Sequence, residues 1–337
     1  MKEILENLYQ HKTLSKLEAK SILIDITKGI YNEYQIASFL TAFLMRNITL
    51  DEIKGFREGL LEQSIKIDLS EYNPIEVCGT GGDSKNTFNI STLTAFVLAG
   101  AKIPVAKHGN YGVSSVSGSS NVLEQLNIKF TTDANILKKC LKEASICFLH
   151  APLFHPAMKT VAPVRKALGV KTFFNMLGPL VNPAQPKVQY VGVFSLELAR
   201  IYCYLFQTEN IQFTIVHSLD GFDEVSLTGS CKVINNLEEN IYHPEDWKLN
   251  TIHLKEIDGG STVEKAAEIF MNILKGKGST AQNNVVLVNS AFAIQTYFPK
   301  INFYDAFDLA KESLFHLKAL KSFQILKEIT YEYLRAN

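Results

Sequence analysis

The stretch Val77-Cys78-Gly79-Thr80-Gly81-Gly82-Asp83 decides how the rest of the chain is interpreted. Residues 75–78 are typical of a short strand, and three glycines within four positions then interrupt it. Asn89-Ile90-Ser91-Thr92 opens an apolar run that stops at Gly100, as a helix would. A strand, a glycine-rich loop and a helix N-terminus in succession can bind an anion, because glycine admits close backbone approach and the first N–H groups of a helix have no internal partner. An ordinary tight turn between strand and helix remains the alternative.

The composition predicts a globular protein with a sizeable core. The chain has 337 residues, of which 46% are hydrophobic and 20% are charged. Lys plus Arg equals Asp plus Glu, at 34 each, so the net charge is zero. We therefore expect no nucleic acid and no membrane as partners, since a nucleic-acid binder normally carries a basic excess and no long apolar run is present. A small anionic ligand needs only a local cluster of donors.

The cysteines indicate a reducing compartment. The five cysteines are scattered and form no C-x-x-C pair, which fits free thiols better than disulfides or zinc. The first residues contain an early acid and no long apolar core, so no signal peptide is predicted. A cytoplasmic location is therefore expected.

Residues 1–70 are predicted to form a small helical domain. Ser15-x-x-Glu18, Asn32-x-x-Gln35 and Thr49-x-x-Glu52 have the spacing of capping boxes. Residues 36, 39, 40, 43 and 44 are apolar and fall on one helix face. This face either packs on the rest of the chain or forms part of a homodimer interface, and the sequence does not separate the two.

From Pro74 onward, short strand patterns alternate with helical ones. The clearest strands are residues 103–106, 146–149, 188–193 and 213–216, and the helices between them are residues 121–126, 134–144 and 196–207. This alternation predicts an α/β domain over 71–337, with a mainly parallel sheet flanked by helices. Ligands bind at the carboxyl ends of the strands in such sheets. We also expect a small antiparallel excursion over 225–257, with short runs at 225–227, 232–234 and 239–242, followed by helices at 263–274, 283–297 and 305–334.

Four further segments carry side chains suited to chemistry. Lys107-His108-Gly109-Asn110 is expected directly after a strand and leads into a serine-rich stretch, Ser115 to Ser120, which could hold a second anionic group. His150 and His155 lie five residues apart, which could suggest a metal, but no Cys or carboxylate falls at ligand spacing. An aromatic-lined pocket or structural histidines are therefore favoured over zinc.

The other two segments offer an arginine and a pair of acids. Arg165 can clamp a carboxylate with its guanidinium, although a solvent-exposed helix charge would look the same in the sequence. Asp223-Glu224, with Asp220 nearby, suits hydrated Mg²⁺, which prefers one or two carboxylates plus water and phosphate oxygens. A solvated acidic turn is the alternative.

Together these motifs resemble the anthranilate phosphoribosyltransferase family, within the class IV phosphoribosyltransferases and nucleoside phosphorylase-like proteins. The motifs at 79–83, 89–92, 107–110, 155–183 and 220–224 occur in that family's order and spacing. The resemblance runs from end to end. It implies transfer of the 5-phosphoribosyl group from phosphoribosyl pyrophosphate to the amine of anthranilate, with release of pyrophosphate, in tryptophan biosynthesis. It also implies a homodimer formed through the helical domain, to which a segment near 160–185 would be joined.

The resemblance assigns roles to individual residues. Two Mg²⁺ ions per site are expected, held by Ser91, Asp223 and Glu224. Anthranilate is expected to contact Gly79, His108, Asn110, His155 and Arg165. Phosphoribosyl pyrophosphate is expected to contact Gly79, Thr80, Gly81, Gly82, Asp83, Thr87, Asn89, Ser91, Thr92, Lys107 and Ser119. No acid or base is assigned.

Three positions depart from the common family pattern. Tyr111 stands where the family commonly has Arg, Asn121 where it commonly has Asp, and His150 where it commonly has an apolar residue. The loss of a cation at Tyr111 puts substrate affinity in question, whereas the predicted phosphate donors and metal ligands are all present.

Other classes remain as rivals. A pyrimidine-nucleoside phosphorylase has a similar fold but needs no Asp-Glu metal pair. The presence of Asp223-Glu224 and of Asn110 therefore argues against a phosphorylase. A nucleic-acid-binding relative without enzymatic activity would need a basic groove in this neutral chain. A nicotinamide enzyme would need the G-x-G-x-x-G spacing, which the stretch at 79–82 lacks.

Overall fold

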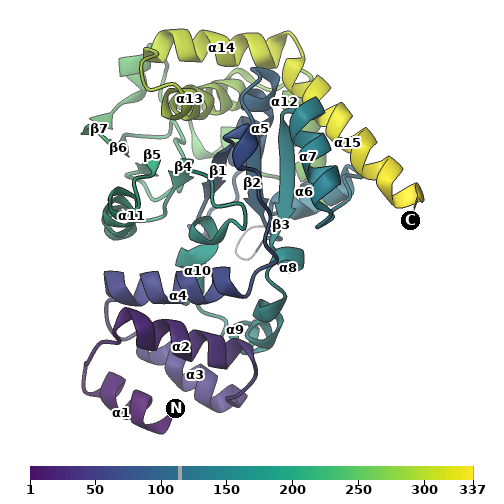
Figure 1. Cartoon of the computed structure of the whole chain (residues 1–337). Coiled ribbons are helices and arrows are strands. Elements are labelled where there is room, and N and C mark those ends of the chain that lie inside the picture. Colours follow the sequence, from purple (N-terminus) through teal and green to yellow (C-terminus); the bar gives the residue numbers. More distant parts are fainter. Residues whose placement is uncertain (113–115, 337) are drawn as a thin grey trace. The chain divides into compact units, whose positions relative to one another are not determined.

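The computed structural model describes residues 1–112 and 116–336, with only the backbone described for 334–336. The chain forms two compact units, each built from two stretches of sequence (Figure 1). The helical unit comprises Met1–Lys66 and Ala151–Pro183, and the α/β unit comprises Ile67–His150 and Ala184–Asn337. The sequence predicts boundaries at residue 70 and near 160–185. No helix within the described residues is long and apolar enough to cross a membrane.

The helical unit contains α-helices and short 3₁₀ helices, the latter labelled η. They are α1 (Lys2–Tyr9), α2 (Lys16–Thr27), α3 (Glu33–Ala42), α4 (Leu50–Glu62), α8 (Ala151–Phe154), η2 (Pro156–Thr160), α9 (Ala162–Leu168), α10 (Phe174–Leu177) and η3 (Gly178–Val181). All three predicted capping boxes are confirmed: they begin α2, α3 and α4, with each cap side chain accepting the N3 backbone N–H.

Aromatic packing forms the core of the helical unit. The rings of Phe56 and Phe173 stack with centroids 4.3 Å apart, and Phe39 and Phe43 meet both of them edge-on. The expectation that Leu44 lies on the same helix face is wrong, because α3 ends at Ala42; the side chain of Leu44 is 43% exposed. Once the helix has ended, its 3.6-residue period no longer decides which side chains face inward.

The α/β unit contains one seven-stranded sheet and the helices that pack against it. The strands are β1 (Ile75–Gly79), β2 (Val105–Gly109), β3 (Ile146–His150), β4 (Val188–Gly192), β5 (Gln212–Ser218), β6 (Cys231–Asn235) and β7 (Glu239–Tyr242). The helices are η1 (Ser70–Tyr72), α5 (Ile90–Gly100), α6 (Ser119–Gln125), α7 (Ala134–Ala144), α11 (Leu196–Thr208), η4 (Pro244–Trp247), η5 (Leu254–Ile257), α12 (Val263–Leu274), α13 (Thr280–Tyr297), α14 (Phe303–Phe315) and α15 (Lys318–Ala336).

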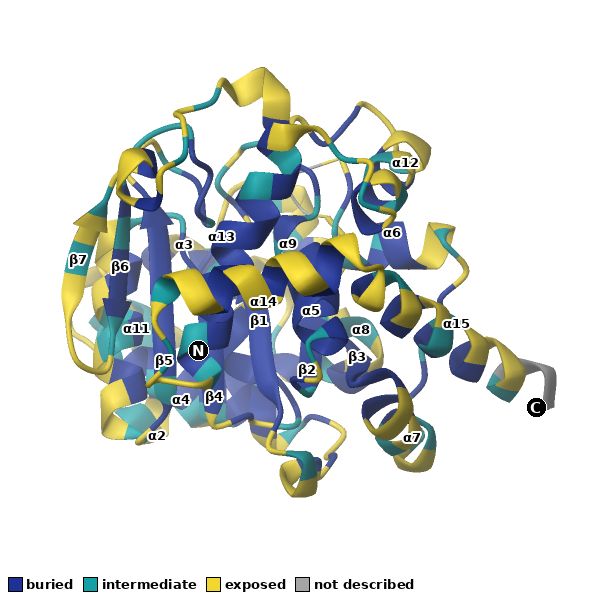
Figure 2. Ribbon diagram, turned by 90° about the horizontal axis from the view of Figure 1, so that it is seen from above, coloured by how far each residue is buried: buried dark blue, intermediate teal, exposed yellow. Residues whose placement is uncertain are grey.

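The strand order is β3-β2-β1-β4-β5-β6-β7. The first five strands of that order are parallel to one another, which confirms the mainly parallel sheet, and β6 and β7 extend its edge antiparallel. Figure 2 shows the central strands as buried, as expected when helices such as α5 and α13 cover a parallel sheet. The topology brings the carboxyl ends of β1, β2, β4 and β5 to one edge, where the predicted motifs lie.

Two sequence expectations in this unit are wrong. Residues 225–227 form no strand, because the side chain of Asn289 in α13 takes both backbone groups of Val225 and Leu227 adopts a left-handed φ of 61°. The helix expected over 305–334 is two helices, α14 and α15, which are separated at Leu317 by a φ of 60°. Residues 225–227 and residues 316–318 contain no glycine or proline, so the sequence within these stretches gives no local signal for the missing strand or for the helix break.

The only tryptophan of the chain, Trp247, belongs to an aromatic cluster in the α/β unit. Its ring stacks on Phe303 at 5.7 Å and contacts Phe292 edge-on and Tyr242 at a tilt. These four residues line part of a cavity of about 310 Å³ beside β5–β7 and α13, which shares no residue with the predicted site.

Candidate active site

The loop that follows β1 has the backbone conformation that its glycines permit. Gly81 and Gly82 adopt φ values of +61° and +73°, which side-chain-bearing residues rarely do. The N–H of Thr80 donates to the carbonyl of Gly192 at the end of β4, 2.9 Å away. The hydroxyl of Thr80 is buried and has no hydrogen-bond partner among the described residues, so the loop holds an unused polar group as well as backbone donors.

The acidic pair after β5 reaches this loop and the start of α5. Asp223 Oδ2 accepts a hydrogen bond of 2.6 Å from the N–H of Gly81, and Glu224 Oε1 accepts one of 2.8 Å from the N–H of Ser91. A Cβ on Gly79 would lie 2.3 Å from Asp223 Oδ2, so only glycine fits there. The structure therefore brings residues 79–83, Ser91, Asp223 and Glu224 close together.

Three carboxyl groups share this corner of the α/β unit. Burial, and then the charge of Asp83, raise the pKa of Asp223 to about 7. Burial and the charge of Asp223 raise the pKa of Glu224 well above its ordinary value, and burial raises that of Asp83. Buried carboxylates that repel one another are stabilised by a cation.

The oxygen donors of this corner fit Mg²⁺ whose coordination shell is completed by oxygens of a bound ligand. Within the described residues, no three His, Cys, Asp or Glu side chains are arranged to hold a metal by themselves. Mg²⁺ commonly uses one or two carboxylates and takes its other oxygens from water and phosphate. Asp223 and Glu224, the latter hydrogen-bonded to the N–H of Ser91, match that requirement.

Lys107 is buried inside β2, whereas the sequence predicts it directly after a strand. Its ammonium donates to the carbonyl of Val77 at 2.6 Å and to the hydroxyl of Ser91 at 3.4 Å. The pKa of Lys107 is lowered by burial. The nearby groups of Glu76, Cys78, Glu224 and Asp223 act in the opposite direction but offset only part of this effect. The Lys107 ammonium therefore lies between the strand that precedes the glycine-rich loop and the first turn of α5.

The remaining polar residues near α5 have structural contacts. Asn89 precedes the helix and donates from Nδ2 to the carbonyl of Ser117, at 3.2 Å. Thr87 forms an isolated antiparallel bridge with Asp258, and Thr92 is fully buried in the first turn of α5.

The end of β2 carries the next group of predicted residues. His108 is buried, and its backbone N–H donates to both carboxylate oxygens of Glu76, each at 3.2 Å. Asn110 is exposed, and its carbonyl accepts from the hydroxyl of Ser119 at 3.3 Å and from the N–H of Ser120 at 3.1 Å. Ser115, which was expected to contribute to an anion site, lies outside the described residues.

His155 and Arg165 belong to the helical unit. The His155 ring is buried, its Nε2 pairs with the carbonyl of Val181 at 2.8 Å, and burial lowers its pKa to about 4. Arg165, in α9, is 5.3 Å from the centre of the Phe174 ring and donates to Asn175 Oδ1 at 3.4 Å. The aromatic face and the amide hold the guanidinium in place.

Sequence reasoning missed two residues of the α/β site. Glu76 is the one charged residue in β1, is completely buried and supports the end of β2 through His108. Gly192, at the end of β4, pairs in register with Gly79 and leaves room for the backbone of Asp223. A single acid inside an apolar strand was a usable signal for Glu76, whereas Gly192 carried no comparable signal.

Known proteins are similar to this chain over nearly its whole length. A model of the glycosyl transferase family α/β domain matches residues 71–319, and one of the helical bundle domain of that family matches residues 2–64. The anthranilate phosphoribosyltransferase of Flavobacterium johnsoniae is 60% identical over 330 residues, which cover 98% of this chain and 100% of the relative. The enzyme of that name from Bacteroides thetaiotaomicron is 51% identical over 329 residues, covering 98% and 99%.

Solved structures share the fold. Anthranilate phosphoribosyltransferase from Thermus thermophilus has a TM-score of 0.90 at 28% identity, covering 97% of this chain and 99% of that one. The enzyme of that name from Saccharomyces cerevisiae, in complex with phosphoribosyl pyrophosphate and Mg, has a TM-score of 0.89 at 26% identity and covers 97% of each chain. The yeast enzyme has also been solved with 4-fluoroanthranilate.

Proposed function

The chain belongs to the glycosyl transferase family with a helical bundle domain and an α/β domain, and on that premise we propose that it is an anthranilate phosphoribosyltransferase. It transfers the 5-phosphoribosyl group from phosphoribosyl pyrophosphate to the amine of anthranilate, in tryptophan biosynthesis. The observation that carries the proposal is the convergence of Asp223 and Glu224 on the glycine-rich loop and the first turn of α5. That arrangement serves a leaving pyrophosphate better than an ordinary turn would.

The proposed donor site lies in the α/β unit. Residues 79–83, with Thr87, Asn89, Ser91, Thr92, Lys107 and Ser119, bind phosphoribosyl pyrophosphate. Backbone donors of the loop and the buried Lys107 cation offset the negative charge that develops on the leaving group. Asp223, Glu224 and Ser91 hold two Mg²⁺ ions, whose chemical contribution is to neutralise pyrophosphate charge.

The acceptor needs orientation more than activation. We propose that Arg165 binds the anthranilate carboxylate, with Gly79, His108, Asn110 and His155 as further contacts. Holding a weak aryl amine in line with the ribose C1 supplies much of the rate enhancement by itself. No side chain is assigned as the acceptor of the amine proton.

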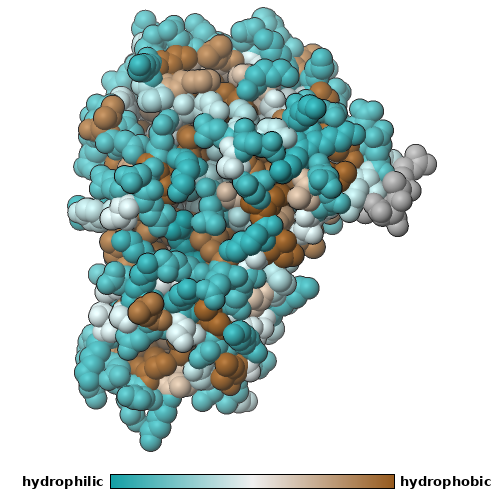
Figure 3. All heavy atoms as spheres, viewed as in Figure 1, coloured by the Kyte–Doolittle hydropathy of each residue, from teal (hydrophilic) through white to brown (hydrophobic). Residues whose placement is uncertain are grey.

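The helical unit is proposed to form a homodimer. It contains a cavity of about 420 Å³ lined by α1, α3 and the residues that follow each of these helices, including Leu8, Ala42 and Met45. Tyr9, Tyr34 and Met45 are more than half exposed, and Figure 3 shows hydrophobic groups on the surface of this unit. A second copy would cover such a face. Met45→Glu is expected to shift sedimentation toward the monomer, and an unchanged distribution would reject this interface.

One assay tests the proposed function. The protein is incubated with Mg²⁺, phosphoribosyl pyrophosphate and anthranilate, and loss of anthranilate fluorescence is followed. We expect a loss that requires all three components and stops when EDTA is added. A parallel incubation with thymidine and phosphate tests the phosphorylase alternative, and phosphorolysis without anthranilate consumption would replace the proposal.

A further inference from the structure

Tyr111, Asn121 and His150 lie close together in the α/β unit. His150 ends β3 and is 5% exposed. Its ring stacks on Phe130, with centroids 4.3 Å apart and planes 17° apart. The Tyr111 ring meets it edge-on at 5.1 Å. The imidazole therefore contacts both Phe130 and the residue that follows Asn110.

A hydrogen bond joins the same ring to α6. The Nδ1 atom of His150 and the hydroxyl of Ser120 are 2.9 Å apart, and both side chains are buried. Ser120 follows Ser119, and its backbone N–H donates to the carbonyl of Asn110 at 3.1 Å. His150 thus contacts Tyr111, which follows Asn110, and Ser120, which follows Ser119. Asn110 is a proposed contact of anthranilate, and Ser119 is a proposed contact of phosphoribosyl pyrophosphate.

Asn121 also contacts the segment between β2 and α6. Asn121 Oδ1 accepts hydrogen bonds from the N–H groups of Gly112, at 2.9 Å, and Gly118, at 3.0 Å. The hydroxyl of Tyr111 donates to Glu124 on α6 at 3.3 Å. These contacts fasten both ends of the segment between β2 and α6 to that helix.

We propose that His150 is a positioning residue that holds Asn110 through Tyr111 and Ser119 through Ser120. The proposal rests on the proposed function, because it assigns substrates to the two positions. An apolar residue at 150 could pack on Phe130 but could not bond Ser120, whose buried hydroxyl would then lose that partner. Burial lowers the pKa of His150 to about 4, so the ring is neutral at physiological pH, and Nδ1 can pair with the Ser120 hydroxyl in either tautomer, as donor or as acceptor.

Two substitutions separate the contacts of His150. His150→Phe keeps a ring against Tyr111 and Phe130 but removes the bond to Ser120. His150→Asn keeps a polar group near the position of Nδ1 but removes the ring. We expect His150→Phe to raise KM for phosphoribosyl pyrophosphate roughly threefold to tenfold, the effect of losing one neutral hydrogen bond, with a smaller change for anthranilate. His150→Asn should show the opposite preference.

A second measurement does not depend on activity. Hydrogen exchange at the Ser120 amide, which donates to Asn110, should accelerate in His150→Phe relative to the wild type and stay closer to wild type in His150→Asn. Lower melting temperatures with unchanged KM values and unchanged exchange would mean that His150 only supports the fold, and would overturn the proposal. Equal KM increases for both substrates in both variants would also overturn it. An inactive wild type would reject the proposed function, while the exchange result would still decide the positioning role.

Discussion

Gly192 lies directly against the backbone of Asp223: a Cβ at position 192 would be 1.5 Å from the carbonyl oxygen of Asp223. The end of β4 thus sets where the acidic pair sits. Gly192→Ala should displace Asp223 and lower kcat/KM by at least about tenfold, while destabilising the protein by roughly 1–3 kcal/mol through overpacking. Gly229→Ala is the matched control, because its Cβ would make only ordinary contacts with Asp220. Steady-state kinetics and thermal unfolding of both variants check this, and a Gly192→Ala enzyme with the kcat/KM of the wild type would contradict it.

Asp223→Asn should make the metal-free protein more stable and abolish most of the transferase activity. Asp223 is buried beside Asp83 and Glu224, so removing its charge relieves repulsion in the metal-free protein. We expect a higher melting temperature than wild type in EDTA, but little further increase on addition of Mg²⁺ with pyrophosphate, and almost no transferase activity. Thermal shift with and without Mg²⁺ measures this. A variant that is less stable than wild type in EDTA would show that the three carboxylates do not destabilise the corner.

Arg165→Ala should raise KM for anthranilate far more than KM for phosphoribosyl pyrophosphate, by at least about tenfold, because a charged hydrogen-bonded pair with the carboxylate is lost. Lys166→Ala, at the next position of α9, is the control, since Lys166 is exposed. Initial rates with each substrate varied in turn provide the comparison. Equal effects on both substrates would remove Arg165 from the acceptor site.

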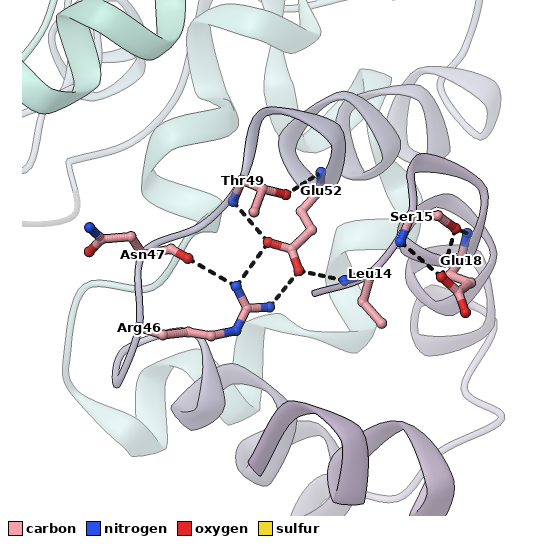
Figure 4. A network of polar contacts seen from close by, with 7 residues as sticks. All are labelled: Leu14, Ser15, Glu18, Arg46, Asn47, Thr49 and Glu52. Carbon is pink, nitrogen blue, oxygen red and sulfur yellow. Dashed lines mark hydrogen bonds and ion pairs between the residues drawn. The ribbon is translucent and has the colours of Figure 1, made fainter. Parts of the chain in front are cut away.

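The Arg46–Glu52 ion pair should stabilise the helical unit far more than a surface pair does (Figure 4). Arg46 donates to both Glu52 oxygens, and the N–H groups of Leu14 and Thr49 donate to the same carboxylate. Burial alone would raise the pKa of Glu52, but these hydrogen bonds hold it below its ordinary value. Glu52→Ala leaves the buried guanidinium without its carboxylate and should cost about 3–5 kcal/mol.

Glu58→Ala is the control for this experiment. Glu58 pairs with Lys16 at 2.6 Å, but both side chains are about 40% exposed, so the loss should be at most about 1 kcal/mol. Urea unfolding of both variants gives the two free energies. Similar values would show that the buried network contributes no more than a surface contact.

Two buried histidines should make stability depend on pH. Burial lowers the pKa of His150 and His155 to about 4 in the folded chain, against about 6.5 when exposed. As the pH falls through 6.5 toward 4, the unfolded chain binds protons that the folded chain does not, so the free energy of unfolding decreases. Each histidine accounts for up to about 3 kcal/mol. Urea unfolding between neutral pH and about pH 5 should show a shallower decline in His150→Phe, and an identical decline would contradict this pKa shift.

The sequence predicts elements more reliably than it predicts the direction of polar side chains. Capping boxes and strand periodicity are local properties, so α2, α3, α4 and the parallel strands followed from them. The burial of Lys107 did not, because it depends on how β2 registers against β1 and on the position of Ser91 in α5. The left-handed residue between α14 and α15 is a leucine, whose intrinsic preference gives no warning of a break.

The single tryptophan, Trp247, gives the protein an internal optical label. Its indole is buried in the aromatic cluster of the α/β unit, while the helical unit contains no tryptophan. Its emission therefore reports the loss of packing in one unit, whereas circular dichroism follows helix content in both. Comparing the two signals during denaturation tells, without any substitution, whether the units melt together or in sequence.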